Sequence, residues 1–351
     1  MRAILVEEPG QEDLNVVEMP DPEPREGHEL VTVLRAGVTY ADIRMRENTY
    51  VAPVTYPHVP GRDLVGVTQE GRRVVALTES GAYAEKALVN RGLCWEIPDD
   101  ITDDQAIALA LPGLSAWHIL HTTLDIKDGE TVLIPGAVSA FGSLAIQLAK
   151  RAGANVVAMT LGESRAELAR TLGADAVVDL NNAAVASDTV IHFDDLPGSP
   201  ADRVTGRHID PRLLADLVLD AAGGPVDAAM DARGGDYFTA TLTALAPRGR
   251  MAVFGCHAGR RSEVSQEALI FGSKTVSGFW LPDHYDNLYA LRNTMNALFA
   301  ATAMGVIKPL IGHRYSLKQA GTAQTVHGCG ATACTPDGKI MIDMRPVSEW
   351  A

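Results

Sequence analysis

The stretch that carries the clearest chemistry in this sequence is VLIPGAVSAFGSLAIQLAK, residues 132–150. An apolar run leads into a turn of small residues, and a helical pattern follows the turn. Such a strand–turn–helix unit directs backbone N–H groups and the positive end of a helix toward an anion, typically the pyrophosphate of a dinucleotide. The predicted cofactor contacts in this turn are Gly136, Ser139, Ala140, Phe141 and Gly142.

This turn departs from the three-glycine fingerprint of dinucleotide sites. Only the outer glycines, Gly136 and Gly142, are present. Ser139 and Ala140 are still small, and the Ser139 hydroxyl can donate a hydrogen bond to phosphate. Their Cβ atoms nevertheless narrow the backbone approach that glycine permits. From the turn alone, a connection that binds nothing remains open as the alternative.

The apolar run after this helix, residues 154–160, indicates which dinucleotide is bound. NAD sites usually hold Asp or Glu at the end of this second strand, where it bonds the ribose 2′-OH. Here the run ends at Thr160, with Ser164 and Arg165 shortly after it. Hydroxyl and guanidinium groups can bind a 2′-phosphate, so we predict NADPH rather than NADH. Glu163 counts against this, and Arg165 as an ordinary exposed helix residue is the alternative.

The cysteines do not form a metal-binding pattern. Only Cys329 and Cys334 are close in sequence, while Cys94 and Cys256 stand alone. A structural zinc site needs two such pairs, or one pair with spaced histidines. His313 and His327 lie near enough in sequence to leave a site assembled in space open, but we expect no metal. We interpret His118 and His121, on one predicted helix, as structural histidines.

The elements that must position these residues change type along the chain. Six short apolar or β-branched runs separated by Pro, Gly and acidic clusters occupy most of the first hundred residues, which predicts a β-rich domain. Residues 99–126 then adopt a helical period, with Thr102 as N-cap. Strands and helices alternate from residue 130 to 255, and this alternation predicts βαβ units with a parallel sheet. A predicted helix at 235–249 belongs to this region.

Three further segments complete the organisation. A polar, Pro- and Gly-containing stretch at about 182–207 is predicted to be an inserted surface loop. Residues 273–280, SKTVSGFW, are predicted to form a strand. A helical pattern at 286–305 follows it, and short strands end the chain near residue 346.

Composition limits the class of protein. The 351 residues predict two domains, and 46% hydrophobic residues exclude wholesale disorder. No apolar run approaches the roughly 18–20 residues that span a bilayer. The first apolar stretch, residues 3–6, is too short for a signal peptide. The net charge of −14 disfavours nucleic acid as a partner. We therefore expect a cytoplasmic protein with a small-molecule substrate and neither membrane nor nucleic acid as partner.

With these features in place, nearly the whole chain resembles the medium-chain dehydrogenase/reductase superfamily, in its zinc-free quinone oxidoreductase (zeta-crystallin-like) branch. The resemblance implies an α/β fold: a GroES-like β-rich catalytic domain from residues 1–116 and 282–351, and a Rossmann domain with a doubly wound parallel sheet at 117–281. The matching stretches are LRAGVTYADIRMRENTY, YPHVPGRDLVGV, GAYAEKALV, LALPGLSAWHIL, VLIPGAVSAFGSLAIQLAKRAGA, RAELARTLGADAVVD, VDAAMDARGGDYFTATLTALAPRGRMAVFG and GVIKPLIGHRYSL.

The resemblance also implies that the catalytic zinc of the superfamily's alcohol dehydrogenases is missing. Thr39 stands at their cysteine ligand and Arg62 at their histidine ligand, and their four-cysteine lobe is absent. Without a Lewis acid, plain alcohol oxidation is disfavoured. Reduction of a quinone or a conjugated alkene remains accessible, because conjugation already activates the acceptor.

Site roles follow from the same resemblance. Tyr50 is expected to hydrogen-bond the acceptor oxygen and to donate a proton, with a packing tyrosine as the alternative. Thr39 and Asp42 are predicted to fix the loop under the nicotinamide, and Arg62 to hold a substrate carboxylate or enolate unless it forms a surface salt bridge. Further predicted cofactor contacts are Ser115, Phe254, Gly255 and Phe279. Trp280 is predicted to line the substrate pocket or a subunit interface.

The resulting hypothesis is a zinc-free NADPH-dependent reductase of quinones or α,β-unsaturated carbonyls. An enoyl reductase of a biosynthetic, polyketide-like pathway is one alternative. A cofactor-free or binding protein with a degenerate phosphate loop is the other. Since the family usually dimerises through its last Rossmann strand, a homodimer through residues 273–280 is expected.

Overall fold

The computed structural model describes residues 1–181, 210–257, 262–328, 337–346, 348 and 350. The chain forms two compact units. The first contains Met1–Leu114, Pro282–Gly328 and the C-terminal stretch, and the second contains Ser115–Leu281. The predicted polar insert at about 182–207 lies outside the described residues, as do Cys329 and Cys334.

The first unit is built on a mostly antiparallel sheet, in which only the β14–β15 pair among the described strands is parallel. Its larger sheet has the order β14-β15-β3-β4-β5-β7, with β6 also paired to β3, and a separate pair joins β1 and β2. Every predicted β run of the first hundred residues is confirmed as a strand. The strands are β1 (Arg2–Ile4), β2 (Val16–Glu18), β3 (His28–Gly37), β4 (Asp63–Thr68), β5 (Arg73–Leu77), β6 (Lys86–Asn90), β7 (Cys94–Glu96), β14 (Ile311–Ser316) and β15 (Lys339–Asp343).

Helices α2 (Asp103–Leu109) and α10 (Ala320–Gly328) of this unit pack against that sheet. Helix α9 (Leu288–Ala303) packs on α2, and α1 (Tyr40–Arg46) packs on α10. The predicted cap of α2 is confirmed, since the Thr102 hydroxyl accepts from the Gln105 N–H at 3.2 Å. Helix α3 (Leu111–His118) and a π-helical turn (Ile119–Thr123) follow α2, so the predicted helix at 99–126 is in fact three segments.

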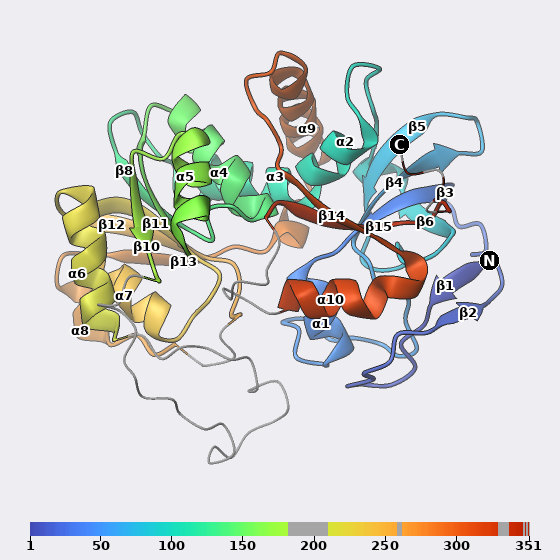
Figure 1. Ribbon diagram of the computed structural model, residues 1–351, viewed down its shortest axis with the longest axis horizontal. Coiled ribbons are helices and arrows are strands. Elements are labelled where there is room, and N and C mark those ends of the chain that lie inside the picture. The colour runs from blue at the N-terminus through green and yellow to red at the C-terminus, as the bar shows by residue number, and fades with distance from the viewer. Residues whose placement is uncertain (182–209, 258–261, 329–336, 347, 349, 351) are drawn as a thin grey trace. The chain divides into compact units, whose positions relative to one another are not determined.

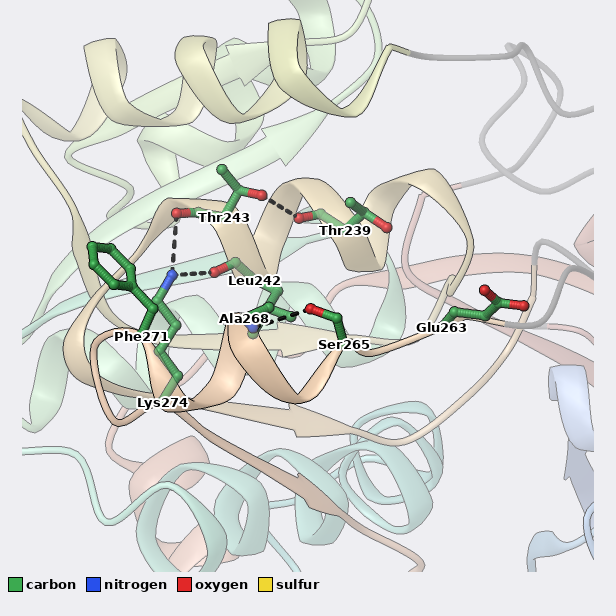
Figure 2. A pocket seen from close by; sticks show the side chains of 8 residues that line it. All are labelled: Thr239, Leu242, Thr243, Glu263, Ser265, Ala268, Phe271 and Lys274. Atoms are coloured by element: carbon green, nitrogen blue, oxygen red, sulfur yellow. Dashed lines mark hydrogen bonds between the residues drawn. The ribbon is translucent and has the colours of Figure 1, made fainter.

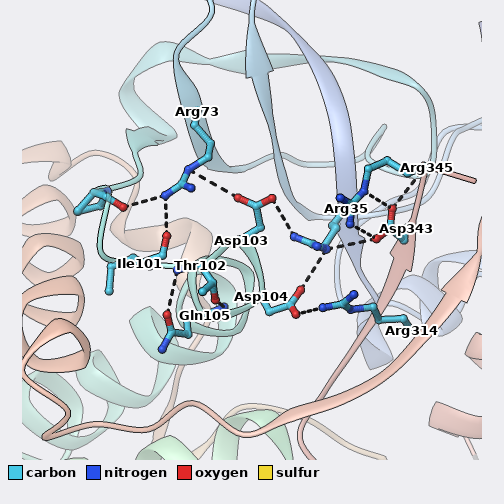
Figure 3. Close-up of polar contacts among 11 residues, drawn as sticks. Arg35, Arg73, Ile101, Thr102, Asp103, Asp104, Gln105, Arg314, Asp343 and Arg345 are labelled. Carbon is cyan, nitrogen blue, oxygen red and sulfur yellow. Dashed lines mark hydrogen bonds and ion pairs between the residues drawn. The ribbon is translucent and has the colours of Figure 1, made fainter. Parts of the chain in front are cut away.

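An ion-pair network anchors α2 to the sheet (Figure 3). Arg35 on β3 pairs with Asp103 at 2.9 Å and Asp104 at 3.0 Å, and with Asp343 of β15 at 3.4 Å. The surrounding arginines that contact the same carboxylates are Arg73, Arg314 and Arg345. Because Arg35 and Asp343 are buried, the network fixes β3, β15 and α2 together inside one unit.

The second unit holds a parallel sheet with the order β10-β9-β8-β11-β12-β13 (Figure 1). Its strands are β8 (Thr131–Pro135), β9 (Asn155–Thr160), β10 (Ala176–Asp179), β11 (Val226–Asp231), β12 (Leu245–Val253) and β13 (Thr275–Gly278). Its helices are α4 (Ala140–Arg151), α5 (Glu163–Thr171), α6 (Pro211–Ala222), α7 (Asp236–Ala244) and α8 (Gln266–Ile270). A parallel sheet in one unit and a separate sheet in the other confirm the predicted fold class.

Two boundaries in this unit differ from expectation. The predicted helix at 235–249 ends at Ala244, and β12 begins at Leu245. Pro247 explains the early end, because proline has no N–H and its ring disfavours helix in the preceding residue. Helix α6 has no counterpart in the predicted elements, although Asp210 caps it, Pro211 begins it and Gly223 ends it in a left-handed conformation.

The described part of the chain contains no helix with the length and apolar character needed to cross a bilayer.

Candidate active site

Helix α1 is held in place by a buried carboxylate. The Thr39 N–H and hydroxyl each donate to Asp42 Oδ2 at 2.8 Å. These two hydrogen bonds cap the N-terminus of α1. The Gly61 N–H donates to the other oxygen, Oδ1, at 3.0 Å. Asp42 therefore ties the turn before α1 to the chain just before β4.

The Asp42 carboxyl is 0% exposed. Burial raises its pKa, while the hydrogen bonds from Thr39 oppose that shift. The Tyr83 hydroxyl, also buried, approaches Asp42 Oδ2 at 3.4 Å. With Thr39 and Gly61 already donating to it, Asp42 positions backbone in this arrangement, and a direct catalytic role for Thr39 or Asp42 remains a prediction.

Tyr50 and Arg62 meet in the same unit. Arg62 Nη1 donates a hydrogen bond to the Tyr50 hydroxyl oxygen, and the guanidinium carbon lies 5.3 Å from the centre of the Tyr50 ring. Arg62 is only 6% exposed, so the predicted alternative of a surface salt bridge is wrong. A buried cation that donates to a phenol oxygen makes the phenol a stronger hydrogen-bond donor.

Sequence reasoning missed Tyr285, a tyrosine close enough to Arg62 for the guanidinium charge to act on its phenol. Burial raises the pKa of Tyr285 to about 12, and the nearby positive charge of Arg62 opposes part of that shift. Tyr285 lies in the turn after Leu281–His284, more than 200 positions from Arg62. No motif surrounds Tyr285, so no feature of the sequence would have identified it.

The carboxylate next to Arg62 in sequence pairs with a different cation. Lys339 on β15 donates to Asp63 Oδ2 at 2.6 Å, and both side chains are fully buried. Sequence reasoning did not identify this pair either, because its two members lie on strands from opposite ends of the chain. Lys339 therefore neutralises the negative charge of Asp63, and Arg62 is not needed as its counter-ion.

In the second unit, the predicted phosphate turn begins α4. Gly136 has a φ of +62°, a conformation that favours glycine. A Cβ at this position would be 3.8 Å from its nearest neighbour, Ser139 Oγ, so the space beside Gly136 is not crowded. A Cβ on Gly142 would lie 2.2 Å from the Gly136 carbonyl oxygen. The two retained glycines are thus required for different reasons, one by backbone conformation and the other by close contact between helix and turn.

The turn fits a pyrophosphate. Ser139 caps α4, since its Oγ accepts from the Gly142 N–H at 3.0 Å, and its hydroxyl hydrogen can still be donated. The first N–H groups of a helix lack intrahelical acceptors, and Ala140 and Phe141 are the first two residues of this twelve-residue helix. Together with the helix dipole, these groups can bind an anion.

Aromatic residues lie at the same edge of the sheet. The rings of Phe141 and Phe254 are 4.4 Å apart between centres. Phe254 directly follows β12, and Phe279 directly follows β13, where its N–H donates to the Val253 carbonyl at 2.8 Å. The carboxyl ends of parallel strands are the usual ligand-binding edge of such sheets, and the structure brings these predicted residues to that edge.

The end of β9 has an acidic neighbour that the sequence prediction missed. Thr160 is buried and pairs in register with Asp179 at the end of β10. Asp179 Oδ1 accepts from the N–H groups of Gly162 at 2.6 Å and Asn181 at 2.9 Å. Ser164 and Arg165 follow in the first turn of α5. A carboxylate therefore does stand beside the second strand, but it comes from the third strand.

The remaining predicted residues are spread over the second unit. Ser115 lies within α3, partly buried, and Trp280 is 38% exposed. His118 contacts the Thr122 hydroxyl at 3.0 Å, and the His121 ring lies 4.5 Å from that of Trp117, which are structural contacts. Among the described residues, no cluster of three or more His, Cys, Asp or Glu side chains is arranged to hold a metal.

A shallow hollow of about 420 Å³ lies elsewhere on this unit, between α7 and α8 (Figure 2). Lys274 donates there to the Leu242 carbonyl at 2.6 Å and so caps the end of α7. None of the predicted site residues lines the hollow, and we do not assign it to the active site. The lining residues are Thr239, Leu242, Thr243, Glu263, Ser265, Ala268, Phe271 and Lys274.

Comparisons with known proteins show which proteins this chain resembles. Residues 140–300 match the zinc-binding dehydrogenase family model. The quinone oxidoreductase of Homo sapiens is 26% identical over 328 residues, which cover 89% of this chain and 89% of the human protein. A mycocerosic acid synthase-like polyketide synthase of Mycobacterium tuberculosis is 26% identical over 92% of this chain, but only 14% of that longer protein is matched.

Solved structures agree with these matches. A mycobacterial protein in complex with NADPH superposes with a TM-score of 0.84 at 26% identity, covering 98% of this chain and 99% of that protein. Sequence relatives, family model and fold point to one group. The chain is therefore similar to the medium-chain dehydrogenase/reductase superfamily, and in particular to its quinone oxidoreductases.

Proposed function

We propose that this protein is an NADPH-dependent reductase that transfers hydride to a quinone or an α,β-unsaturated carbonyl without a metal ion. The observation that carries the proposal is the Tyr50–Arg62 pair, in which a buried guanidinium donates to the phenol oxygen. Such a phenol is suited to stabilise negative charge that develops on an acceptor oxygen. The human relative is a quinone oxidoreductase, and a structural relative binds NADPH.

The cofactor contacts follow from the second unit. Ser139 and the first N–H groups of α4 hold the pyrophosphate. Thr160, Ser164 and Arg165 bind the 2′-phosphate. Ser115, Phe254, Gly255 and Phe279 contact the rest of the cofactor. NADPH, when bound, supplies the hydride.

The substrate side of the reaction uses residues of the first unit. An enone gains a hydride at its β-carbon and a proton at its α-carbon, so charge collects on the carbonyl oxygen between the two events. Tyr50 donates a hydrogen bond to that oxygen, and Arg62 stabilises the phenol as it does so. Thr39 and Asp42 hold the turn before α1 against Gly61, the residue that precedes Arg62.

Zinc independence is supported by the chemistry of the residues present. The Thr39 hydroxyl is already committed to Asp42. Arg62 carries a positive charge and has no lone pair to offer a cation. The carbonyl therefore has to be polarised by hydrogen bonding.

The polyketide synthase relative favours a second candidate, an enoyl reductase acting on a biosynthetic intermediate. A cofactor-free protein is disfavoured, because Gly136 and Gly142 keep the geometry that leaves the start of α4 open. The proposal also includes the predicted domain boundaries, a cytoplasmic location and a homodimer through residues 273–280. Strand β13, at the end of its sheet, supports the homodimer.

Titration of the purified protein with NADPH and NADH, together with a Tyr50→Phe variant, tests this function. We expect saturable NADPH binding, weaker NADH binding, and reduction of simple quinones and enones. Tyr50→Phe should lower kcat about 100-fold without changing the NADPH Kd. Tyr289→Phe, at a tyrosine that is 78% exposed, is the matched control. Absence of binding at millimolar NADPH would overturn the proposal.

A further inference from the structure

We propose that the substrate of this enzyme carries a carboxylate directly on its acceptor carbonyl, and that Arg62 with Tyr285 forms the site for it. The substrate class is then the 2-oxo-3-enoic acids, in which C=C, C=O and COO⁻ are consecutive. This inference rests on the proposed function, since it takes Tyr50 as the group that binds the carbonyl oxygen.

The first observation is a buried guanidinium without a carboxylate partner. Arg62 is 6% exposed, yet none of the aspartates and glutamates that the structure describes forms an ion pair with it. Its buried Nε has no hydrogen-bond acceptor among those residues. Burying a charged group is costly unless it is paired and hydrogen-bonded. An anionic ligand would supply the counter-charge and the hydrogen-bond acceptors that the Arg62 guanidinium lacks.

The carboxylates of Asp42 and Asp63 are committed to other donors. Asp42 accepts four hydrogen bonds, two from Thr39, one from Gly61 and a longer one from Tyr83. Asp63 pairs with Lys339 at 2.6 Å. Arg62 is therefore the cation in this cluster that has no direct counter-charge, although the field of Asp42 still reaches it.

The groups beside Arg62 are neutral donors. Tyr50 shares a hydrogen bond with it, and Tyr285 lies close enough for the guanidinium charge to act on its phenol, whose pKa is about 12. Tyr285 thus stays protonated at neutral pH and does not neutralise Arg62. A guanidinium next to hydroxyl donors is a suitable set for a planar carboxylate with two acceptor oxygens.

Adjacency sets the position of the carboxylate in the substrate. Arg62 Nη1 donates directly to the Tyr50 oxygen, so the two side chains are adjacent. A substrate whose carbonyl oxygen binds to Tyr50 and whose anionic group binds to Arg62 must therefore carry these two groups next to each other. The oxygens of a 2-oxo acid meet that requirement. A carboxylate at the far end of a substrate does not.

The test compares three enones with the same styryl acceptor: (E)-2-oxo-4-phenylbut-3-enoate, the neutral (E)-4-phenylbut-3-en-2-one, and the distal acid (E)-4-(4-carboxyphenyl)but-3-en-2-one. The measured quantity is kcat/KM for each, expressed as a ratio to the neutral ketone. We expect the 2-oxo acid to be preferred by about 100-fold or more over the distal acid.

Variants separate binding at Arg62 from the intrinsic reactivity of the 2-oxo acid. Arg62→Met should reduce the ratio of 2-oxo acid to neutral ketone about 100-fold, and Arg62→Lys by less, since lysine keeps the charge but not the planar donor set. Tyr285→Phe should reduce the ratio a few-fold. Arg72→Met, which removes an exposed arginine paired with Glu29, should leave the ratio unchanged.

A binding measurement that needs no turnover accompanies these rates. Calorimetry with the saturated acid 2-oxo-4-phenylbutanoate should give a Kd at least 30-fold weaker for Arg62→Met than for the parent protein. Circular dichroism establishes that each variant is folded.

The outcomes distinguish this inference from the proposed function. If the neutral ketone is reduced but Arg62→Met leaves both the ratio and the Kd unchanged, the carboxylate site is wrong and the reductase stands. Equal preference for the distal acid also overturns the site. If no enone is reduced but the saturated acid binds in an Arg62-dependent way, the site stands and the proposed reaction fails.

Discussion

Gly142 shows at the scale of one residue how a missing Cβ shapes the phosphate turn. A Cβ there would come within 2.2 Å of the Gly136 oxygen and 2.8 Å of the Gly136 carbonyl carbon. Both atoms are backbone, so the turn itself has to move. We expect Gly142→Ala to weaken NADPH binding at least tenfold and to lower the free energy of unfolding by about 2 kcal/mol.

A matched control separates loss of the turn from loss of stability. Gly129, unlike Gly142, has a positive φ, +80°, and nothing lies within 4 Å of its would-be Cβ. Gly129→Ala should cost about 1 kcal/mol of stability through backbone strain alone and leave the NADPH Kd unchanged. Equal NADPH affinities for the two variants would contradict a special role for Gly142. Fluorescence titration and urea unfolding provide both quantities.

The same scale shows which site residues a sequence can reveal. Gly136, Ser139 and Gly142 follow one another in a strand–turn–helix pattern, so their proximity is a local property. Tyr285 and Lys339 join Arg62 and Asp63 only because the first unit combines both ends of the chain. Their partners are fixed by tertiary packing, which no spacing rule encodes.

At the scale of elements, helix α10 carries a histidine whose environment makes stability depend on pH. Burial, reinforced by the positive charge of Lys339, lowers the pKa of His327 to about 4. In the unfolded chain this pKa is about 6.5. As the pH falls below about 6.5, the unfolded chain takes up a proton that the folded chain does not, so the free energy of unfolding falls until the pH reaches about 4.

His327→Gln removes this difference in proton uptake. Between pH 7 and pH 4.5, the loss of unfolding free energy should be smaller in the variant by about 2 kcal/mol. This figure lies below the full linkage value because pH 4.5 is still above the folded-state pKa of about 4. His313→Gln, on an exposed side chain of β14, is the control. Urea unfolding at several pH values measures the slopes, and identical slopes for His327→Gln and the parent would refute the assignment.

Elements differed in how well their sequence specified them. Strands β1 to β6 were predictable, because each is an apolar or β-branched run between Pro, Gly or acidic residues, whereas the short β7 (Cys94–Glu96) was not predicted. Helix α6 has the local signals of a helix at both ends. The polar stretch before it, at about 182–207, nevertheless suggested that the loop continues through these residues. The end of α7 was misjudged because Leu245 and Ala246 continue its apolar pattern, and only Pro247 indicates the change to β12.

At the scale of the whole molecule, the edge of the parallel sheet is the surface to test for self-association. Strand β13 ends the sheet and pairs only with β12 among the described strands. Just before it, at the end of α8, Ile270 is 76% exposed and Phe271 85% exposed. An unpaired edge strand next to two exposed apolar side chains is typical of an interface between copies.

If β13 pairs with itself across a twofold axis, Ile270 and Phe271 become covered in both copies. Phe271→Glu introduces two like charges at such an interface, and neither can be solvated there. We expect the parent protein to sediment as a dimer and Phe271→Glu to dissociate at least 100-fold more readily, with unchanged circular dichroism. Leu213→Glu, at a leucine on α6 that is 47% exposed, should remain dimeric. A monomeric parent protein, or a Phe271→Glu variant as tightly associated as the parent, would exclude this edge as the interface.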